Sequence, residues 1–146
     1  MEKRFHVTAD VVYKKAEGAE LRLDIGVDEA AAPAGEGDRR PIIMMIPGGA
    51  WLSGNRAIPG TRILMQRFAQ RGFLVSSVSY RVSSSAIFPA QLQDVWDAVR
   101  WLRDNAYRLG ANGDSVGAMG HSAGGHLAAL LGLTWIDRSW AGTVRR

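Results

Sequence analysis

The chain contains no cysteine, and this absence excludes three kinds of chemistry at once. Disulfide bonds, cysteine-based metal sites and cysteine nucleophiles all need a thiol. Histidine is scarce as well, because only 3 occur among the 146 residues, and they are scattered without the spacing of metal ligands. We therefore expect no catalytic metal, and no motif in the sequence implies another cofactor.

Long apolar segments are also missing. The longest runs, residues 42–46 and 127–133, fall far short of the roughly 18 residues that a membrane-spanning helix needs. Charged residues interrupt the first ten positions, where a signal peptide requires an unbroken apolar stretch. The sequence thus predicts a cytoplasmic protein that does not associate with membranes.

Basic residues outnumber acidic ones, 18 to 14, but they are spread along the chain. A nucleic-acid interface needs a basic cluster with interleaved aromatic residues. The nearest approach to a cluster is Arg62, Arg67 and Arg71, whose spacing is that of the solvated face of a helix. The glycine-rich turns match neither of the nucleotide-binding glycine motifs. Binding of nucleic acids or nucleotides is therefore disfavoured.

The order of the apolar segments favours an α/β fold. Residues 7–13 and 20–27 have the character of two strands of a hairpin, and the continuously apolar residues 42–46 are typical of a strand buried on both faces. Helices are expected over residues 61–70, 90–107 and 123–133. Two further strands are expected over residues 73–80 and 115–119, and a turn over residues 111–114. This pattern predicts a mostly parallel sheet with an antiparallel amino-terminal hairpin and helices on both faces.

Gly120, Ser122 and Gly124 fit the pattern G-x-S-x-G, and the context of these residues strengthens the match. A nucleophile elbow needs a strand before the serine and a helix after it, with small residues where the backbone passes close to the serine. All of these conditions are met here. The alternative, a glycine-rich turn with a bystander serine, is the weaker interpretation.

Acyl transfer also needs backbone donors directed at the oxyanion. One donor is expected from Ala123, which follows the serine, and another from the loop after an earlier buried strand. Residues 47–51, with two glycines, follow the strand at 42–46. Alone this segment would be read as a flexible loop, but together with the serine motif it predicts an oxyanion hole.

Several segments of the chain resemble one known family. They are residues 10–13, 21–24, 47–51, 79–81, 88–95 and 120–129. They resemble the α/β-hydrolase fold, in the branch of hormone-sensitive-lipase-like and feruloyl-esterase-like bacterial carboxylesterases. By this resemblance, Ser122 is the nucleophile.

The resemblance also implies the roles of the neighbouring residues. The oxyanion hole would be lined by the amides of Gly49, Ala50 and Ala123. Gly48 and Trp51 would contact the substrate, with Trp51 beside the acyl pocket. Pro47 departs from the family, which normally has a histidine at this place, so a hydrogen bond that orders the loop must be replaced or absent.

The catalytic triad is a second departure. The fold places the acid and then the histidine well after the serine in the chain. Residues 123–146 contain His126 and Asp137 but no later histidine. His126 is expected to be a packed helix residue, and His121 to point away from the serine. We therefore predict an incomplete triad in one domain, residues 1–146, that corresponds to the amino-terminal half of an α/β-hydrolase.

Two functions remain open. The first is a serine carboxylesterase for small esters, with a base borrowed from a neighbouring subunit or an unconventional base. The second is a catalytically weak or inactive truncated hydrolase that acts only as a binding or assembly module. Because the strand from Ser115 to Met119 would have a bare edge, we also predict a homo-oligomer that covers it. Trp135, Ile136 and Trp140 are expected to pack across that edge.

Overall fold

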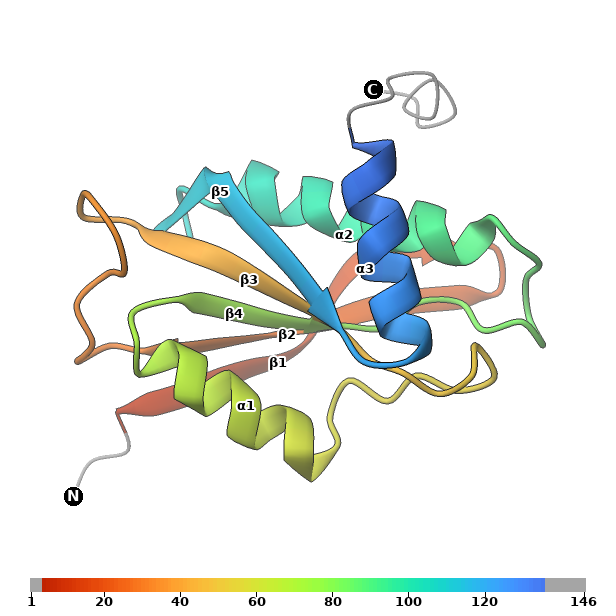
Figure 1. Cartoon of the computed structure of the whole chain (residues 1–146), viewed down its shortest axis with the longest axis horizontal. Coiled ribbons are helices and arrows are strands. Elements are labelled where there is room, and N and C mark those ends of the chain that lie inside the picture. Colours follow the sequence, from red (N-terminus) through yellow and green to blue (C-terminus); the bar gives the residue numbers. More distant parts are fainter. Residues whose placement is uncertain (1–3, 136–146) are drawn as a thin grey trace.

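The computed structural model describes residues 4–135, which form a five-stranded sheet with three helices (Figure 1). The strands are β1 (Phe5–Ala16), β2 (Ala19–Asp28), β3 (Arg40–Ile46), β4 (Leu74–Val78) and β5 (Ala111–Gly120). Their order in the sheet is β1-β2-β4-β3-β5. β2 runs antiparallel to both of its neighbours, and β4, β3 and β5 are parallel to one another. The predicted fold class is confirmed.

The helices cover both faces of this sheet, as expected. They are α1 (Pro59–Ala69), α2 (Ala90–Asn105) and α3 (Ala123–Thr134). Met65 and Ala69 of α1 pack against Met45 and Val75 in one buried cluster. A larger cluster lies on the opposite face, which α2 and α3 cover (Figure 1), and it contains buried apolar side chains of both helices. The apolar run at the end of β3 contributes side chains to both clusters, because alternate side chains of a strand point to opposite faces of the sheet.

α2 has the apolar stripe that the sequence predicted. Leu92, Val95, Val99 and Leu102 recur at spacings of three and four residues, and all four are buried in the larger cluster. α1 ends with a glycine in the left-handed region, since Gly72 has φ +88 and its N–H donates to the carbonyl oxygen of Ala69. This glycine caps the end of the helix.

β5 is longer than predicted. It begins at Ala111, which pairs with Arg40, but the next paired residue is Val116, opposite Ile42. The four residues between them interrupt the register, and the N–H of Asp114 bonds to Oδ1 of Asn112 within this stretch. The turn expected at residues 111–114 is therefore a local irregularity inside a strand. Within the described part of the chain, β5 pairs with β3 alone and its other edge has no partner.

The helices of residues 4–135 are all too short, or too polar, to cross a lipid bilayer. The cytoplasmic location stays a prediction. Trp135 stacks on Trp96 of α2, with ring centroids 4.3 Å apart, and it lines a hollow together with Val116 and Ala118 of β5. Ile136 and Trp140 lie outside the described residues.

Candidate active site

Ser122 lies at a sharp bend between β5 and α3. Its backbone has φ 53 and ψ −122, a conformation that side-chain-bearing residues rarely adopt. Such a conformation costs on the order of 1–3 kcal/mol and persists only where the surrounding structure enforces it. The residue is exposed, so its hydroxyl is accessible to a substrate. The bend has the form expected of a nucleophile elbow.

The two motif glycines allow the backbone to close around this bend. A Cβ on Gly120 would lie 2.2 Å from the carbonyl carbon of Gly124, and a Cβ on Gly124 would lie 2.0 Å from the carbonyl oxygen of Ile46. Both distances are far inside van der Waals contact, so neither position has room for a side chain. The glycine spacing in the sequence is thus explained by the approach of β5, α3 and the end of β3.

The loop after β3 lies directly beside the elbow. A Cβ on Gly48 would lie 3.3 Å from Cβ of Ser122 and 2.5 Å from the carbonyl oxygen of His121. The next three residues, Gly49, Ala50 and Trp51, all have positive φ, at 141, 54 and 60. The loop expected to contribute to an oxyanion hole is therefore in contact with the candidate nucleophile.

Several backbone donors at this junction have no partner. Ala123 is the first residue of α3, and the N–H groups of a helix's first turn lack intrahelical acceptors. Within residues 4–135, the N–H groups of Ala123, Gly49 and Ala50 donate no hydrogen bond. The positive end of the α3 dipole also faces this point. Such an arrangement can bind an anion or a developing oxyanion.

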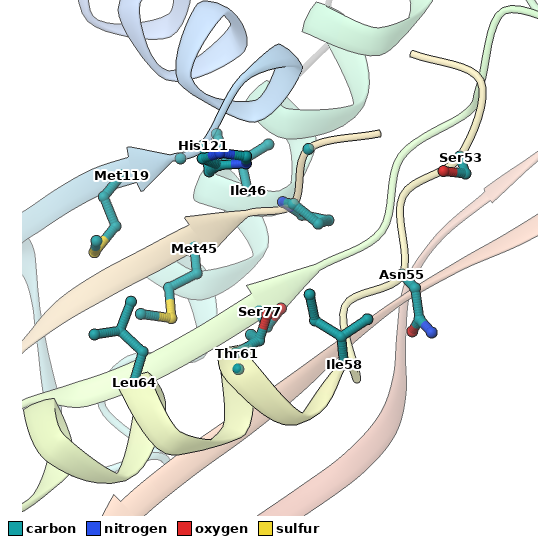
Figure 2. Close-up of a pocket in the computed structure, with 14 residues that line it drawn as sticks. Met45, Ile46, Ser53, Asn55, Ile58, Thr61, Leu64, Ser77, Met119 and His121 are labelled. Carbon is teal, nitrogen blue, oxygen red and sulfur yellow. The ribbon is translucent and has the colours of Figure 1, made fainter. Parts of the chain in front are cut away.

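A pocket of about 380 Å³ lies next to the elbow, on the α1 face of the sheet. Figure 2 shows Met45, Met119 and Leu64 facing one another along it, with Ser53, Asn55 and Ser77 farther along. Gly48, Gly120 and His121 also line the pocket, whereas Ser122 and Trp51 do not. The pocket therefore adjoins the candidate nucleophile through Gly120 and His121, which precede it, and through Gly48 of the neighbouring loop.

The histidines do not complete a triad within the described residues. No imidazole between residues 4 and 135 forms a hydrogen bond with the Ser122 side chain. His126 is exposed, and its ring lies edge-on to Trp51 with a centroid distance of 5.5 Å. His121 lines the pocket, and His6 is 3.2 Å from Glu29 at the edge of the β1–β2 hairpin. No general base is therefore identified among these residues.

One buried carboxylate, Asp24, was not predicted as an organising residue. Asp24, 1% exposed, accepts hydrogen bonds from the Asp10 N–H and from the guanidinium groups of Arg56 and Arg62. The interpretation of Arg62 as part of a solvated helix face was therefore wrong. The alternation of residues 21–25 placed Asp24 on the polar side of its strand, and its arginine partners lie 32 and 38 positions away, so no signal of this pairing was visible in the sequence.

Comparison with known proteins places this geometry in a family. Residues 29–145 match the family described as BD-FAE. The chain belongs to the BD-FAE family. Esterase LipQ of Mycobacterium tuberculosis (strain ATCC 25618 / H37Rv) is 38% identical to this BD-FAE chain over 131 residues, covering 89% of it and 30% of LipQ. Esterase LipC of the same strain is 42% identical over 97 residues, covering 66% of it and 24% of LipC.

Solved structures of esterases also resemble this chain. The thermophilic esterase Est2 of Thermogutta terrifontis is 36% identical, with a TM-score of 0.69, and the match covers 86% of the BD-FAE chain and 43% of Est2. Another structure shows Thermogutta terrifontis esterase 2 phosphorylated by paraoxon. The resemblance to α/β-hydrolase carboxylesterases is thus confirmed. The BD-FAE chain spans less than half of the length of each of these relatives.

Proposed function

We propose that this BD-FAE chain is a serine carboxylic-ester hydrolase that acts on small esters through Ser122. One observation carries the proposal: an exposed serine in a strained bend lies between unpartnered N–H groups from two separate segments. Strain at such a position is typical of functional residues. Esterase names among the relatives support the same reaction class.

The proposed reaction proceeds in two steps. Oγ of Ser122 attacks the ester carbonyl carbon while a base takes the hydroxyl proton, and the carbonyl oxygen becomes an oxyanion held by the amides of Gly49, Ala50 and Ala123. The carbon–oxygen bond then breaks, and the alcohol leaves with the proton. Water attacks the acyl group on Ser122, which releases the carboxylic acid and restores the hydroxyl. Each amide donor that is lost costs roughly 2.7–4 kcal/mol of transition-state stabilisation.

The general base in this scheme is proposed to be borrowed from a neighbouring subunit or to be an unconventional group. Loss of the serine or its histidine lowers kcat on the order of a millionfold in a serine hydrolase. The oxyanion hole and substrate binding alone still give a rate roughly 10³–10⁴ times that of the reaction in water. Because no imidazole among residues 4–135 is hydrogen-bonded to the Ser122 hydroxyl, we also propose a second candidate function. In that case the chain is a weak or inactive hydrolase that serves as a binding or assembly module.

Small esters are proposed as substrates because of the pocket beside the elbow. Its volume of about 380 Å³ lies near the lower end of the roughly 300–1,000 Å³ of ligand pockets. Its walls are largely apolar, with Met45, Leu64 and Met119 among them. Gly48 forms part of the wall, and we assign Trp51, 40% exposed at the rim of the elbow, to the contact with the acyl group.

A second copy of the chain is proposed to cover the free edge of β5. Residues 116–120 contain no charged residue and no proline, which are the usual devices that prevent edge-to-edge pairing. Gly117→Lys adds a charge at an open position and should shift the protein towards monomer in light scattering. A monodisperse monomer of the unaltered chain at micromolar concentration would remove this part of the proposal.

Paraoxon tests the nucleophile directly. Attack by Oγ of Ser122 on phosphorus expels p-nitrophenolate and leaves a diethyl phosphate ester, which intact-mass and peptide mass spectrometry locate. We expect labelling at Ser122 in the unaltered chain and none in Ser122→Ala. Hydrolysis of p-nitrophenyl acetate is measured in parallel. Absence of labelling, together with equal hydrolysis by both proteins, would overturn the proposed esterase function. It would favour the second candidate, a binding or assembly module.

A further inference from the structure

Two groups of hydrogen bonds tie the ends of the loop at residues 47–51 to the segment that follows β4. The hydroxyl of Tyr80 donates to the carbonyl oxygen of Pro47 at 2.7 Å. At the other end, the N–H and the hydroxyl of Ser83 donate to the carbonyl oxygen of Trp51, at 2.7 and 3.1 Å. The loop that carries two proposed oxyanion donors is thus held at its start and at its end.

The segment that holds the loop is itself fixed to α2. Asp94, fully buried, accepts the backbone N–H of Arg81 at 2.9 Å and pairs with its guanidinium through Nε at 2.9 Å and Nη2 at 2.8 Å. Lys14 adds a further bond to the same carboxylate at 2.8 Å. Bidentate pairs of this kind fix orientation as well as distance. Residues 80–83 therefore form a rigid support.

The loop needs an external support because its own conformation is unfavourable. Ala50 and Trp51 both have positive φ, where residues with a Cβ are strained. Pro47 contributes no N–H, so its carbonyl oxygen is the one backbone polar group through which it can be held. Because a peptide unit is planar, fixing this carbonyl also fixes the N–H of Gly48, and with it the point from which the Gly49 and Ala50 amides follow.

We propose that Tyr80 is a positioning residue, whose hydroxyl, supported by the Arg81–Asp94 pair, sets the direction of the Gly49 and Ala50 amides. In this chain it supplies the anchor that Pro47 cannot supply with a side chain of its own. Tyr80 is well placed for this task, since it is buried and its ring packs 3.4 Å from the position that a Cβ on Gly54 would take. The catalytic consequence rests on the proposed function.

Tyr80→Phe tests this role, and Tyr13→Phe is the matched control. The hydroxyl of Tyr13 also donates to a backbone carbonyl, that of Ser79, but it does not touch the loop. We expect Tyr80→Phe to slow phosphorylation by paraoxon about ten- to a hundredfold, since a misplaced site loses activity on this scale. The kcat for p-nitrophenyl acetate should fall with little change in KM. Tyr13→Phe should retain the rates of the unaltered chain.

Backbone dynamics give a readout that does not depend on catalysis. The ¹⁵N order parameters of Gly49 and Ala50 should fall from about 0.85 towards 0.6 in Tyr80→Phe and stay high in Tyr13→Phe. If the unaltered chain does not react with paraoxon, the proposed function fails and the order parameters alone decide the role of Tyr80. Equal order parameters in the two variants, or equal loss of rate, would overturn the proposal.

Discussion

Gly124, at the start of α3, lies against the carbonyl oxygen of Ile46, the last residue of β3. A Cβ at position 124 would lie 2.0 Å from that oxygen. The contact joins the helix that follows the candidate nucleophile to the strand that precedes the candidate oxyanion loop. The close approach of the Ser122 bend to the loop at residues 47–51 therefore depends on the absence of a side chain at position 124.

Gly124→Ala should consequently destabilise the fold strongly. A clash with backbone cannot be relieved by rotating a side chain, so we expect a loss of about 3 kcal/mol or more in the free energy of unfolding. Gly132→Ala, near the other end of α3, is the control because a Cβ there meets nothing within 4 Å. That variant should be more stable by about 0.5–1 kcal/mol. Urea unfolding of both variants measures the difference, and similar stabilities would contradict the close contact.

The conformation of Ser122 leads to a second prediction. With φ 53 and ψ −122, this position suits glycine better than any residue with a Cβ. Ser122→Gly should therefore be more stable than Ser122→Ala by about 1 kcal/mol, while neither variant reacts with paraoxon. Thermal unfolding tests the stability and mass spectrometry the reactivity. If glycine were no more stable than alanine, the strain at the elbow would be absent.

The sharp bend at Ser122 could be predicted from the sequence because its determinants are local. Gly120, Ser122 and Gly124 lie within five consecutive residues, and an apolar helical segment follows them directly. The irregular start of β5 could not be predicted in this way. Its register depends on pairing with Arg40, 71 positions earlier, and the polar residues between Ala111 and Val116 have the composition of a turn.

The supports of the loop were missed for the same reason. Tyr80 and Pro47 are 33 positions apart, and Ser83 and Trp51 are 32 apart. Helical or strand periodicity carries no information about such pairings, because it reports only which face of an element is buried. The sequence thus indicated which residues carry the proposed chemistry, whereas the residues that hold them in place became visible only in three dimensions.

Asp24 should be important for stability because it joins three segments. Asp24→Asn removes a buried charge that faces Arg56 and Arg62. Arg62 then loses its ion pair with Asp24, whereas Arg56 keeps its pair with the exposed Asp10. Because the two arginines are partly exposed, the expected loss is about 2–3 kcal/mol, below the roughly 3–5 kcal/mol of a fully buried pair. Glu20→Gln, which removes an exposed ion pair with Arg22, should change stability by less than about 1 kcal/mol. Equal effects in chemical denaturation would show that the Asp24 contacts are not stabilising.

Tyr13 should make the stability fall at high pH. Burial, and then the negative charges of Asp94 and Asp97, raise the pKa of the Tyr13 hydroxyl well above its ordinary value of 10.0. The folded chain therefore keeps this proton at a pH where the unfolded chain has released it. Since the folded state then binds more protons, the free energy of unfolding decreases as the pH rises above about 10, by about 1.4 kcal/mol per pH unit for one proton.

The Tyr13→Phe variant isolates this effect, because other groups that titrate near pH 10 are the same in both proteins. Below pH 9 the variant should be less stable than the unaltered chain by about 1 kcal/mol, since it lacks the hydrogen bond to Ser79. Between pH 10 and 11 the difference should shrink and then reverse. Urea midpoints measured across this range give the comparison, and two parallel stability curves would mean that the buried hydroxyl titrates alike in the folded and unfolded states.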